Sequence, residues 1–199
     1  MLSKQQSENY TLALDHMADL TFAAFAYLRL PLAMAAGALL LGTAALWCSE
    51  RRKRYFGAAV MLVIFLQAAR LAMVAFDPYL SSYAVADALN ALPKGQLVFN
   101  GEFYRYSSVG FYTDYKPYIL NGRINNLEYG SYAPNAPQVF IDDHQFLDIW
   151  KGPALAYIIT YDEDRKSLEK LVGSSQVHQV MRSGGKQLLS NMAVTSRTE

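Results

Sequence analysis

The chain has 199 residues, enough for one ordinary domain plus a membrane element, and it is 52% hydrophobic with a formal net charge of +1. From Asp77 to Glu199 there are 11 Lys or Arg against 13 Asp or Glu, so this mildly acidic part has no broad basic face and we expect no nucleic-acid partner. The single cysteine, Cys48, excludes an internal disulfide and a CxxC metal or redox motif.

The first segment, residues 1–29, has apolar residues at mostly helical spacing within "LALDHMADLTFAAFAYLRLPL". This pattern predicts an amphipathic helix that lies on the outer leaflet and bends at Pro31. The segment carries acidic residues and lacks a short basic start, so we do not expect a cleaved signal peptide. His16 lies between Asp15 and Asp19, and we interpret it as part of an exposed helix face rather than a metal site.

Two long apolar runs follow, at residues 30–48 and 56–76. A helix of about 20 apolar residues crosses the hydrocarbon core of a bilayer, so both runs predict transmembrane helices. The alternative, two buried helices of a soluble core, fits poorly because the runs are longer than the usual apolar stripe. The basic turn between them, residues 49–55 ("SERRKRY"), favours the cytoplasmic side. The sequence therefore predicts a multi-pass protein of the inner (plasma) membrane, with its N-terminus and residues 77–199 on the periplasmic or extracellular side.

Arg70 interrupts the second run close to its outer end. One interpretation is an interfacial anchor whose guanidinium reaches the phosphate headgroups of membrane lipid. The other is a contact with the phosphate of a lipid-linked substrate, for which a planar guanidinium is well suited.

Residues 77–199 have a mixed α/β pattern. A helix is predicted within 81–95, a second within 162–173, and a closing pair of strands around the turn "RSGG". Short runs of β-forming residues predict further strands at 96–100, 117–121, 138–141 and 154–161. The expected fold class is α/β with transmembrane helices: a two-span helical hairpin followed by a small mixed, mostly parallel α/β sheet domain with helices on both faces.

The segment from Glu102 to Tyr132 does not fit this simple alternation. It contains nine Phe or Tyr residues, which suit an aromatic core, a membrane interface or sugar stacking. Its polar residues, dense enough to suggest a binding loop, are Asn121, Arg123, Asn125, Asn126 and Glu128. The alternative is a loop whose polar groups interact with one another, with Asn and Gly in left-handed turns and Arg123 paired with Glu128.

The string "VFIDDH", residues 139–144, resembles an acid/base or metal site at first sight. We interpret it instead as a strand passing into a helix, with Asp142 as N-cap, Gln145 completing a capping box and Asp143 favoured by the helix dipole. The sequence has no nucleophile motif, phosphate-binding loop or Cys/His cluster. We therefore assign no catalytic residue, and we expect no metal and no cofactor.

One long string carries a family resemblance: "FYRYSSVGFYTDYKPYILNGRINNLEYGSYAPNAPQVFIDDHQFLDIW", preceded by "QAARLAMVAFDPYLSS" and followed by "SGGKQLLSN". It resembles the C-terminal part of bacterial GT-C membrane glycosyltransferases, the group of aminoarabinose transferase and protein O-mannosyltransferases. The resemblance implies a polyprenyl-phosphate sugar as donor and a site on the outer face of the inner membrane. It also implies a catalytic carboxylate in the first external loop of a bundle with many more spans than two. The catalytic half would then be missing, so that the chain is either a fragment or a separately encoded half that needs a partner.

Three hypotheses for function follow. The first is the C-terminal membrane and external domain of such a glycosyltransferase, not catalytically competent alone, with substrate-binding residues Arg70, Glu102, Tyr104, Arg123, Asn125, Asn126, Glu128 and Tyr129. The second is a membrane-anchored external binding or assembly module for a protein or glycolipid partner. The third, a hydrolase that uses paired carboxylates, is least favoured because no set of nucleophile, base and orienting group is present.

Overall fold

The computed structural model describes residues 26–48 and 50–194, and the chain divides into two compact units. Residues 26–77 form the first described unit, the helical hairpin, and residues 78–194 form the second, the α/β domain. The predicted amphipathic helix at 1–29, with His16, lies almost entirely outside the described residues. Its last described part is a short 3-10 helix, η3 (Ala26–Leu28).

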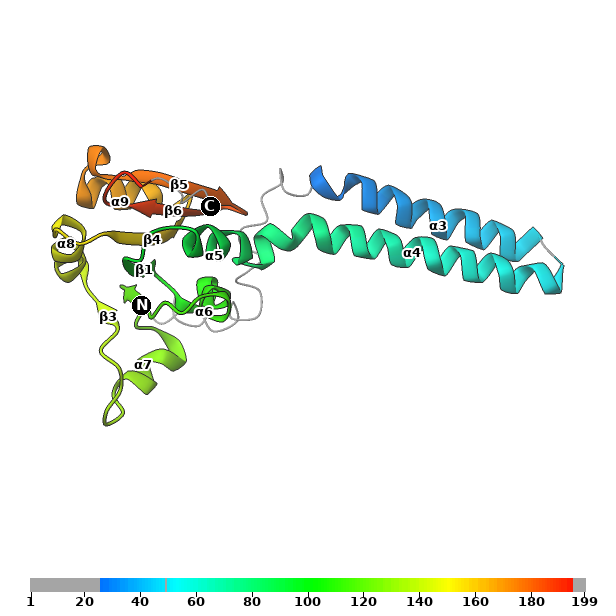
Figure 1. Cartoon of the computed structure of the whole chain (residues 1–199). Helices are drawn as coiled ribbons and strands as arrows, with labels where there is room; N and C mark the ends of the chain where they lie inside the picture. Colours follow the sequence, from blue (N-terminus) through cyan, green and yellow to red (C-terminus); the bar gives the residue numbers. More distant parts are fainter. Residues whose placement is uncertain (1–25, 49, 195–199) are drawn as a thin grey trace, which may run out of the picture. The chain divides into compact units, whose positions relative to one another are not determined.

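The helical hairpin consists of α3 (Arg29–Cys48) and α4 (Arg51–Leu80), which run side by side in opposite directions (Figure 1). Small residues let the two backbones approach, as is usual between membrane helices. The Met61 side chain fills the space that a Cβ at Gly42 would need, and a Cβ at Gly57 would lie 3.3 Å from that of Ala45. Glycine and alanine therefore lie at the close contacts of the hairpin, where they leave room for Met61 and for the facing backbone.

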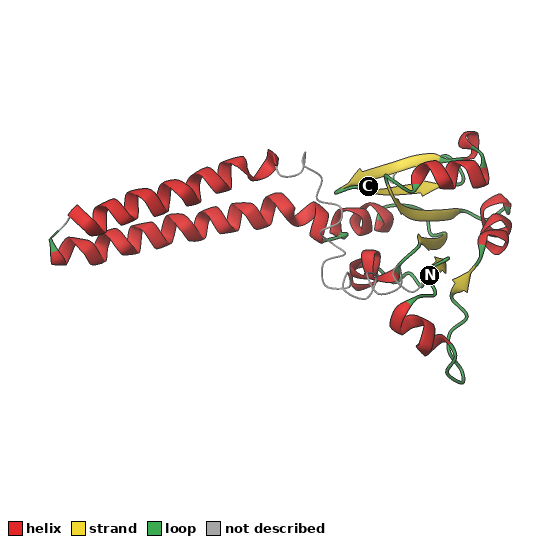
Figure 2. Ribbon diagram, turned by 180° about the vertical axis from the view of Figure 1, so that it is seen from behind, coloured by secondary structure: helices red, strands yellow, loops and turns green. Residues whose placement is uncertain are grey.

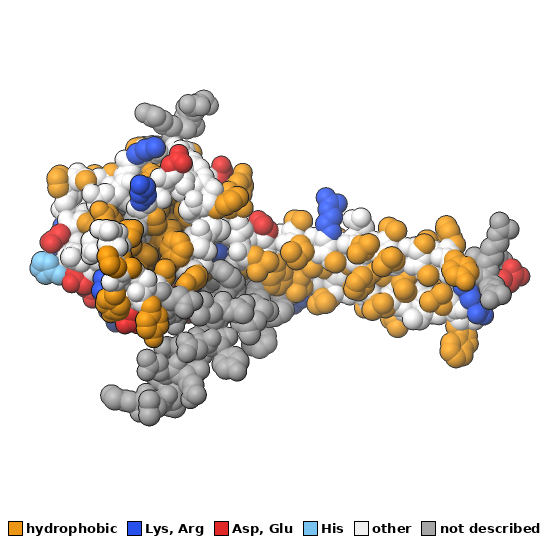
Figure 3. All heavy atoms as spheres, turned by 90° about the horizontal axis from the view of Figure 1, so that it is seen from below, with side chains coloured by type: hydrophobic (Ala, Val, Ile, Leu, Met, Phe, Trp, Pro, Cys, Tyr) orange, Lys and Arg blue, Asp and Glu red, His pale blue; other side chains and the backbone are white. Residues whose placement is uncertain are grey.

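Both helices are long and apolar enough to cross a membrane. Only 17% and 6% of the residues in their apolar windows are buried inside the chain, and apolar side chains cover the face that Figure 3 shows. Such exposed apolar helices suit lipid rather than water, which supports a membrane location. The basic residues Arg51–Arg54 belong to the first turn of α4, and Pro31 lies in the first turn of α3, where its missing N–H removes no helical hydrogen bond.

The α/β domain is built on one six-stranded sheet with the order β3-β2-β1-β4-β6-β5. The first four strands in this order, β3, β2, β1 and β4, are parallel to one another, and β6 is antiparallel to both β4 and β5. The strands are β1 (Gln96–Asn100), β2 (Tyr118–Leu120), β3 (Phe140–Ile141), β4 (Ala156–Tyr161), β5 (His178–Ser183) and β6 (Lys186–Ser190). The predicted fold class, a two-span hairpin followed by a mixed and mostly parallel α/β domain, is confirmed.

Helices cover both faces of the sheet (Figure 2). One face packs against α5 (Tyr83–Asn90), η4 (Phe103–Tyr106) and α6 (Ser107–Tyr112), and the other against α8 (Asp143–Lys151) and α9 (Arg165–Val172). The division follows from the two-residue period of a strand. In β1, for example, Leu97 and Phe99 belong to the first core, whereas Val98 belongs to the second.

Several local details differ from expectation. The segment from Glu102 to Tyr132, for which no helix was predicted, contains η4, α6 and α7 (Asn125–Ser131). The helix predicted within 162–173 begins only at Arg165, and Asp164 is an N-cap whose side chain makes no capping hydrogen bond. Ser82 likewise occupies the N-cap of α5 without a side-chain cap, while Ser81 Oγ accepts a hydrogen bond from the backbone N–H of Tyr83 at 3.0 Å.

The β5–β6 turn is a two-residue loop, Gly184 and Gly185, with φ of 56° and 79°. Positive φ at both positions is the usual geometry of a tight hairpin, which glycine adopts without strain. A Cβ at Gly184 would collide with the backbone carbonyl of Pro78. The hairpin turn is therefore pressed against the start of the α/β domain, where α4 ends.

Candidate functional site

The candidate site lies at the carboxyl ends of the parallel strands. The chain moves outward from β1 through β2 to β3, and then returns to place β4 on the other side of β1. The order of strands thus reverses between β1 and β4, and open α/β sheets bind ligands in the crevice at such a switch point. A hollow of about 490 Å³ lies at the carboxyl ends of β1 and β2. We call it the first hollow; its polar lining comes from Asn100, Asn121, Asp143, Asp164, Ser167 and Lys170.

Two asparagines hold the strand ends in place around this hollow. Asn100 Nδ2 donates to Thr160 Oγ1 at 2.9 Å, which joins the ends of β1 and β4. Asn121 follows β2 with φ of 54°, a left-handed conformation that asparagine tolerates better than most residues, and its Nδ2 donates to Asp143 Oδ1 at 2.7 Å. The position of the Asp143 carboxylate is therefore fixed by a residue from the neighbouring strand.

The start of α8 confirms the structural interpretation of "VFIDDH". Asp142 Oδ1 accepts a hydrogen bond from the backbone N–H of Gln145 at 2.8 Å, and the backbone N–H of Asp142 donates to Gln145 Oε1 at 3.1 Å. His144 points to solvent, with Nδ1 3.3 Å from Asp148 Oδ2. Within residues 26–48 and 50–194, no group of three or more His, Cys, Asp or Glu side chains could hold a metal ion. The motif is thus a capping box beside the first hollow.

A second hollow, of about 350 Å³, adjoins the first and shares Asn121 with it. Arg123 lines this second hollow, and its guanidinium carbon lies 5.1 Å from the ring centroid of Phe140 and 5.8 Å from that of Tyr132. The hydroxyl of Tyr132 donates to Glu128 Oε1 at 3.4 Å. Among the ion pairs of the described residues none joins Arg123 to Glu128, so the direct pair of the alternative interpretation is not present there, and Tyr132 contacts both residues instead.

The electrostatics of the first hollow are mixed, with two carboxylates and one lysine. Burial raises the pKa of Asp164, Glu163 beside it raises that pKa further, and Arg105 lowers it. Arg105 is held between Glu163, at 3.5 Å, and the ring of Tyr161, at 5.1 Å from the centroid. Amide and carboxylate groups around the apolar side chains of the hollow form a lining that can orient a small hydroxyl-rich ligand.

The structure separates the predicted site residues into groups. Arg123, Glu128 and the exposed Tyr129 lie on or just before α7, whose first turn also holds Asn125 and Asn126, although the side chains of those two lie outside the described part. Glu102 and Tyr104 are half-buried just after β1, where Glu102 is the N-cap of η4. Arg70 is exposed and belongs to the helical hairpin. Their role in substrate binding stays a prediction.

The sequence reasoning did not select most of the residues around the first hollow, among them Asn100, Asp164, Ser167 and Lys170. These four come from two separate segments, the end of β1 and the region of α9, and none belongs to a recognisable motif. The available signal was position for three of them, because Asn100 ends a parallel strand and Asp164 and Ser167 lie at the start of the helix after another, and such ends meet at one edge of a sheet. Lys170, in the last turn of α9, had no such signal.

No family model matches the sequence, and no curated protein matches it. Two solved structures are similar in fold: ArnT from Cupriavidus metallidurans in the apo state, with a TM-score of 0.60, and the same protein bound to undecaprenyl phosphate, with a TM-score of 0.61. Each is 16% identical to this chain and matches 95% of it. The chain spans 38% and 36% of the length of those two chains. The likeness shows that this chain shares the fold of the matching part of ArnT.

Proposed function

We propose that this chain is the membrane and external part of a glycosyltransferase that uses a polyprenyl-phosphate sugar as donor. The observation that carries the proposal is the fold likeness to ArnT, which extends over 95% of this chain and includes a structure with undecaprenyl phosphate bound. It is supported by two exposed apolar helices and by a polar crevice at the switch point of the α/β sheet.

The orientation proposed from the sequence is kept. The basic first turn of α4, Arg51–Arg54, is placed in the cytoplasm, because short loops rich in Lys and Arg favour that side. The α/β domain then faces the periplasm or the cell exterior.

Each part of the proposed site has a chemical task. Arg70 binds the lipid phosphate as a planar cation. The guanidinium carbon of Arg123 lies over the rings of Phe140 and Tyr132, and its N–H groups are assigned to donate to sugar or phosphate oxygens. The remaining predicted residues, assigned to sugar positioning, are Glu102, Tyr104, Asn125, Asn126, Glu128 and Tyr129.

We further propose that the chain does not transfer sugar alone. Its described part has two helices able to cross a membrane, and the chain spans less than two fifths of the ArnT chains that it resembles. The catalytic carboxylate would come from further spans, either in a longer reading frame or in a partner chain.

Lipid binding tests the first part of the proposal. Native mass spectrometry of the full chain in nanodiscs, titrated with undecaprenyl phosphate, should show saturable binding. Arg70→Gln should weaken that binding about tenfold, the cost of losing one charge-assisted contact. Arg29→Gln is the matched control, because α3 begins at the same end of the hairpin at which α4 finishes and the exposed Arg29 has the same charge. Equal loss in both variants would mean general attraction to anions and would contradict a specific phosphate contact.

Activity tests the second part. The purified full chain, incubated with a polyprenyl-phosphate sugar and candidate acceptors, should give no transfer, and robust transfer would overturn the proposed dependence on a partner. The assembly-module alternative makes a different prediction: Arg123→Ala would weaken capture of a protein partner and leave undecaprenyl phosphate binding and cell-envelope glycolipids unchanged.

A further inference from the structure

Three large aromatic side chains, Tyr83, Phe111 and Tyr112, form a connected group on the surface of the α/β domain, which we call the aromatic surface. They are 53%, 84% and 40% exposed. Tyr83 and Tyr112 meet edge to face with ring centroids 5.1 Å apart, and Phe111 and Tyr112 do so at 5.2 Å. Connected apolar surface of this kind usually marks a contact with another molecule or with a membrane.

The aromatic surface is held firmly by the helices beneath it. Val85 of α5 and Val109 of α6 are buried in the same core, so both helices are anchored on the sheet. The backbone N–H of Ser82 donates to Ser108 Oγ at 3.0 Å, and Asn90 Nδ2 donates to the carbonyl of Tyr112 at 3.0 Å. The three rings therefore project from two helices that are anchored on the sheet and joined to each other by hydrogen bonds.

Chain length brings this surface close to a bilayer. The candidate membrane span in α4, Arg54–Leu80, ends at Leu80, and Tyr83 is three residues further on, a distance of about 11 Å at most. The polar headgroup layer on each side of a bilayer is about 5–7 Å thick. Because Tyr112 contacts Tyr83 and Phe111 contacts Tyr112, the whole group lies within reach of the leaflet in which α4 ends.

The chemistry of the surface fits that layer. Tyrosine has an apolar ring and a polar hydroxyl, and it is enriched where hydrocarbon meets water. The sequence of α6, "SSVGFY", contains no charged residue that would have to leave water. Phe111, the most exposed of the three, has no polar group to satisfy.

We infer that the aromatic surface is a membrane-contact site, with its rings in the phospholipid headgroup layer next to the end of α4. The inference depends on the membrane location of α3 and α4, and it does not depend on sugar transfer. It gives the α/β domain a second contact with the bilayer in addition to its covalent connection.

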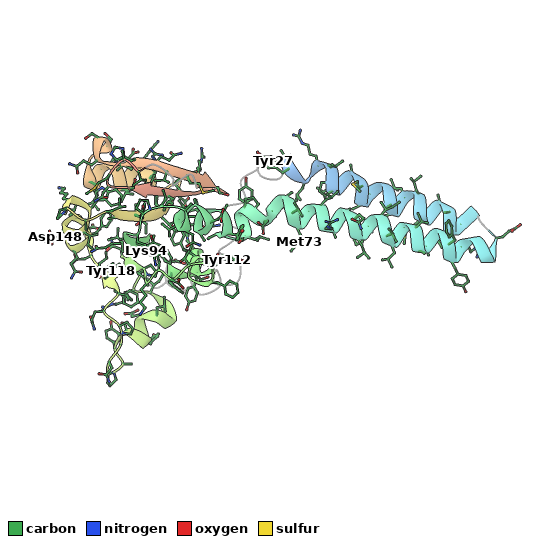
Figure 4. All side chains as sticks on the ribbon, viewed as in Figure 1. Tyr27, Met73, Lys94, Tyr112, Tyr118 and Asp148 are labelled. Carbon is green, nitrogen blue, oxygen red and sulfur yellow. The ribbon has the colours of Figure 1, made fainter. Side chains whose placement is uncertain are left out.

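Nitroxide accessibility tests the inference with the full chain in phospholipid nanodiscs. In a Cys48→Ser background, a nitroxide is attached at Phe111→Cys and, as the control, at Asp148→Cys. Asp148 lies on α8, on the opposite face of the sheet, and its side chain is 73% exposed. Figure 4 labels Asp148 and Tyr112, which lie toward opposite ends of the α/β domain in that view. The label at position 111 should collide readily with oxygen, which concentrates in lipid, and poorly with a water-soluble nickel chelate, whereas position 148 should show the reverse.

Two results would overturn the inference. Equal access of the nickel chelate to both positions would place Phe111 in water. Shielding of position 111 from both oxygen and the chelate would mean that protein covers the surface, either residues 1–25 of the same chain or a second copy. Tyr112→Cys provides a second label site, so the result does not depend on one variant.

Discussion

Lys186 Nζ donates a hydrogen bond to the backbone carbonyl of Tyr79 at 3.0 Å, across 107 residues of sequence. The same ammonium group lies 3.3 Å from the carbonyl of Ser81, and the side chain is almost fully buried. Carbonyls at the C-terminal end of a helix lack intrahelical partners and carry partial negative charge, so a lysine there both satisfies and neutralises them. A residue of the β5–β6 hairpin thus completes the end of α4.

Lys186→Met should therefore destabilise the α/β domain by about 1–3 kcal/mol, because it leaves buried carbonyl groups without a donor. Denaturant unfolding of the full chain in detergent, followed by the fluorescence of the buried Trp150, measures the effect. Lys166→Met, at an exposed position of α9, is the control and should change stability by less than about 0.5 kcal/mol. Equal effects at both positions would contradict the capping role.

Asp142→Ala should cost about 1 kcal/mol, because it removes the side-chain acceptor of the α8 capping box. Asp148→Ala, which removes an exposed carboxylate from the same helix, should cost much less. Thermal unfolding of both variants separates the two effects. A loss of undecaprenyl phosphate binding in Asp142→Ala without loss of stability would instead indicate a functional carboxylate.

Asp164 should make stability depend on pH. Burial, the main cause, and Glu163 raise its pKa in the folded protein, while Arg105 lowers it. The folded protein therefore holds this proton more tightly than the unfolded chain. The stabilising contribution is complete below the unfolded pKa of about 3.9 and is lost as pH rises through the folded pKa.

Asp164→Asn should consequently gain stability relative to the parent protein as pH rises from acidic values to neutrality. Unfolding free energies measured across that range give the difference. Glu163→Gln should shift this pH-dependent loss of stability toward lower pH, because it removes the negative charge that raises the pKa of Asp164. A constant difference between Asp164→Asn and the parent would show that this carboxyl group titrates alike in the folded and unfolded states.

The Tyr157 hydroxyl should lose its proton only at a pH well above that of an exposed tyrosine. Burial and the neighbouring Tyr115 raise the pKa of Tyr157 to about 12, and its hydroxyl donates to the carbonyl of Pro93 at 2.8 Å. The contribution of this group to stability is intact below pH ~10 and is lost as pH rises through 12. Tyr157→Phe should cost about 1 kcal/mol at neutral pH. It should also remove a late-ionising group from the ultraviolet titration, whereas Tyr129→Phe, at an exposed position, should not cost stability.

The regular part of the fold could be predicted from the sequence because residue propensities and turn residues indicated the same elements there. The strand 96–100 is a short run of mainly β-forming residues bounded by Gly95 and Gly101, and the predicted boundaries match β1. The "RSGG" turn was readable for the same reason, since two adjacent glycines select one hairpin geometry. By contrast, α6 and α7 have six and seven residues and include glycine, so neither is long enough to show a helical period.

The candidate site was less readable because its geometry is tertiary. Arg123 and Glu128 have opposite charges at close spacing, which suggested an ion pair, but Phe140 from β3 draws the guanidinium onto an aromatic ring. Asp143 is set by Asn121, 22 residues earlier, and that contact exists only because β2 ends beside the start of α8. Contacts between strand ends depend on the order of strands in the sheet, and that order cannot be predicted from the sequence of any single segment.

The two edge strands of the sheet bear on how copies of this protein meet when they are crowded together. β3, at one edge, is only two residues long, and β5, at the other, has a register irregularity between Gln179 and Met181. Short or bulged strands are poor templates for the backbone of another molecule. Neighbouring copies in the same membrane would therefore pair poorly through either edge strand. This reduces the tendency of the protein to aggregate by joining sheets.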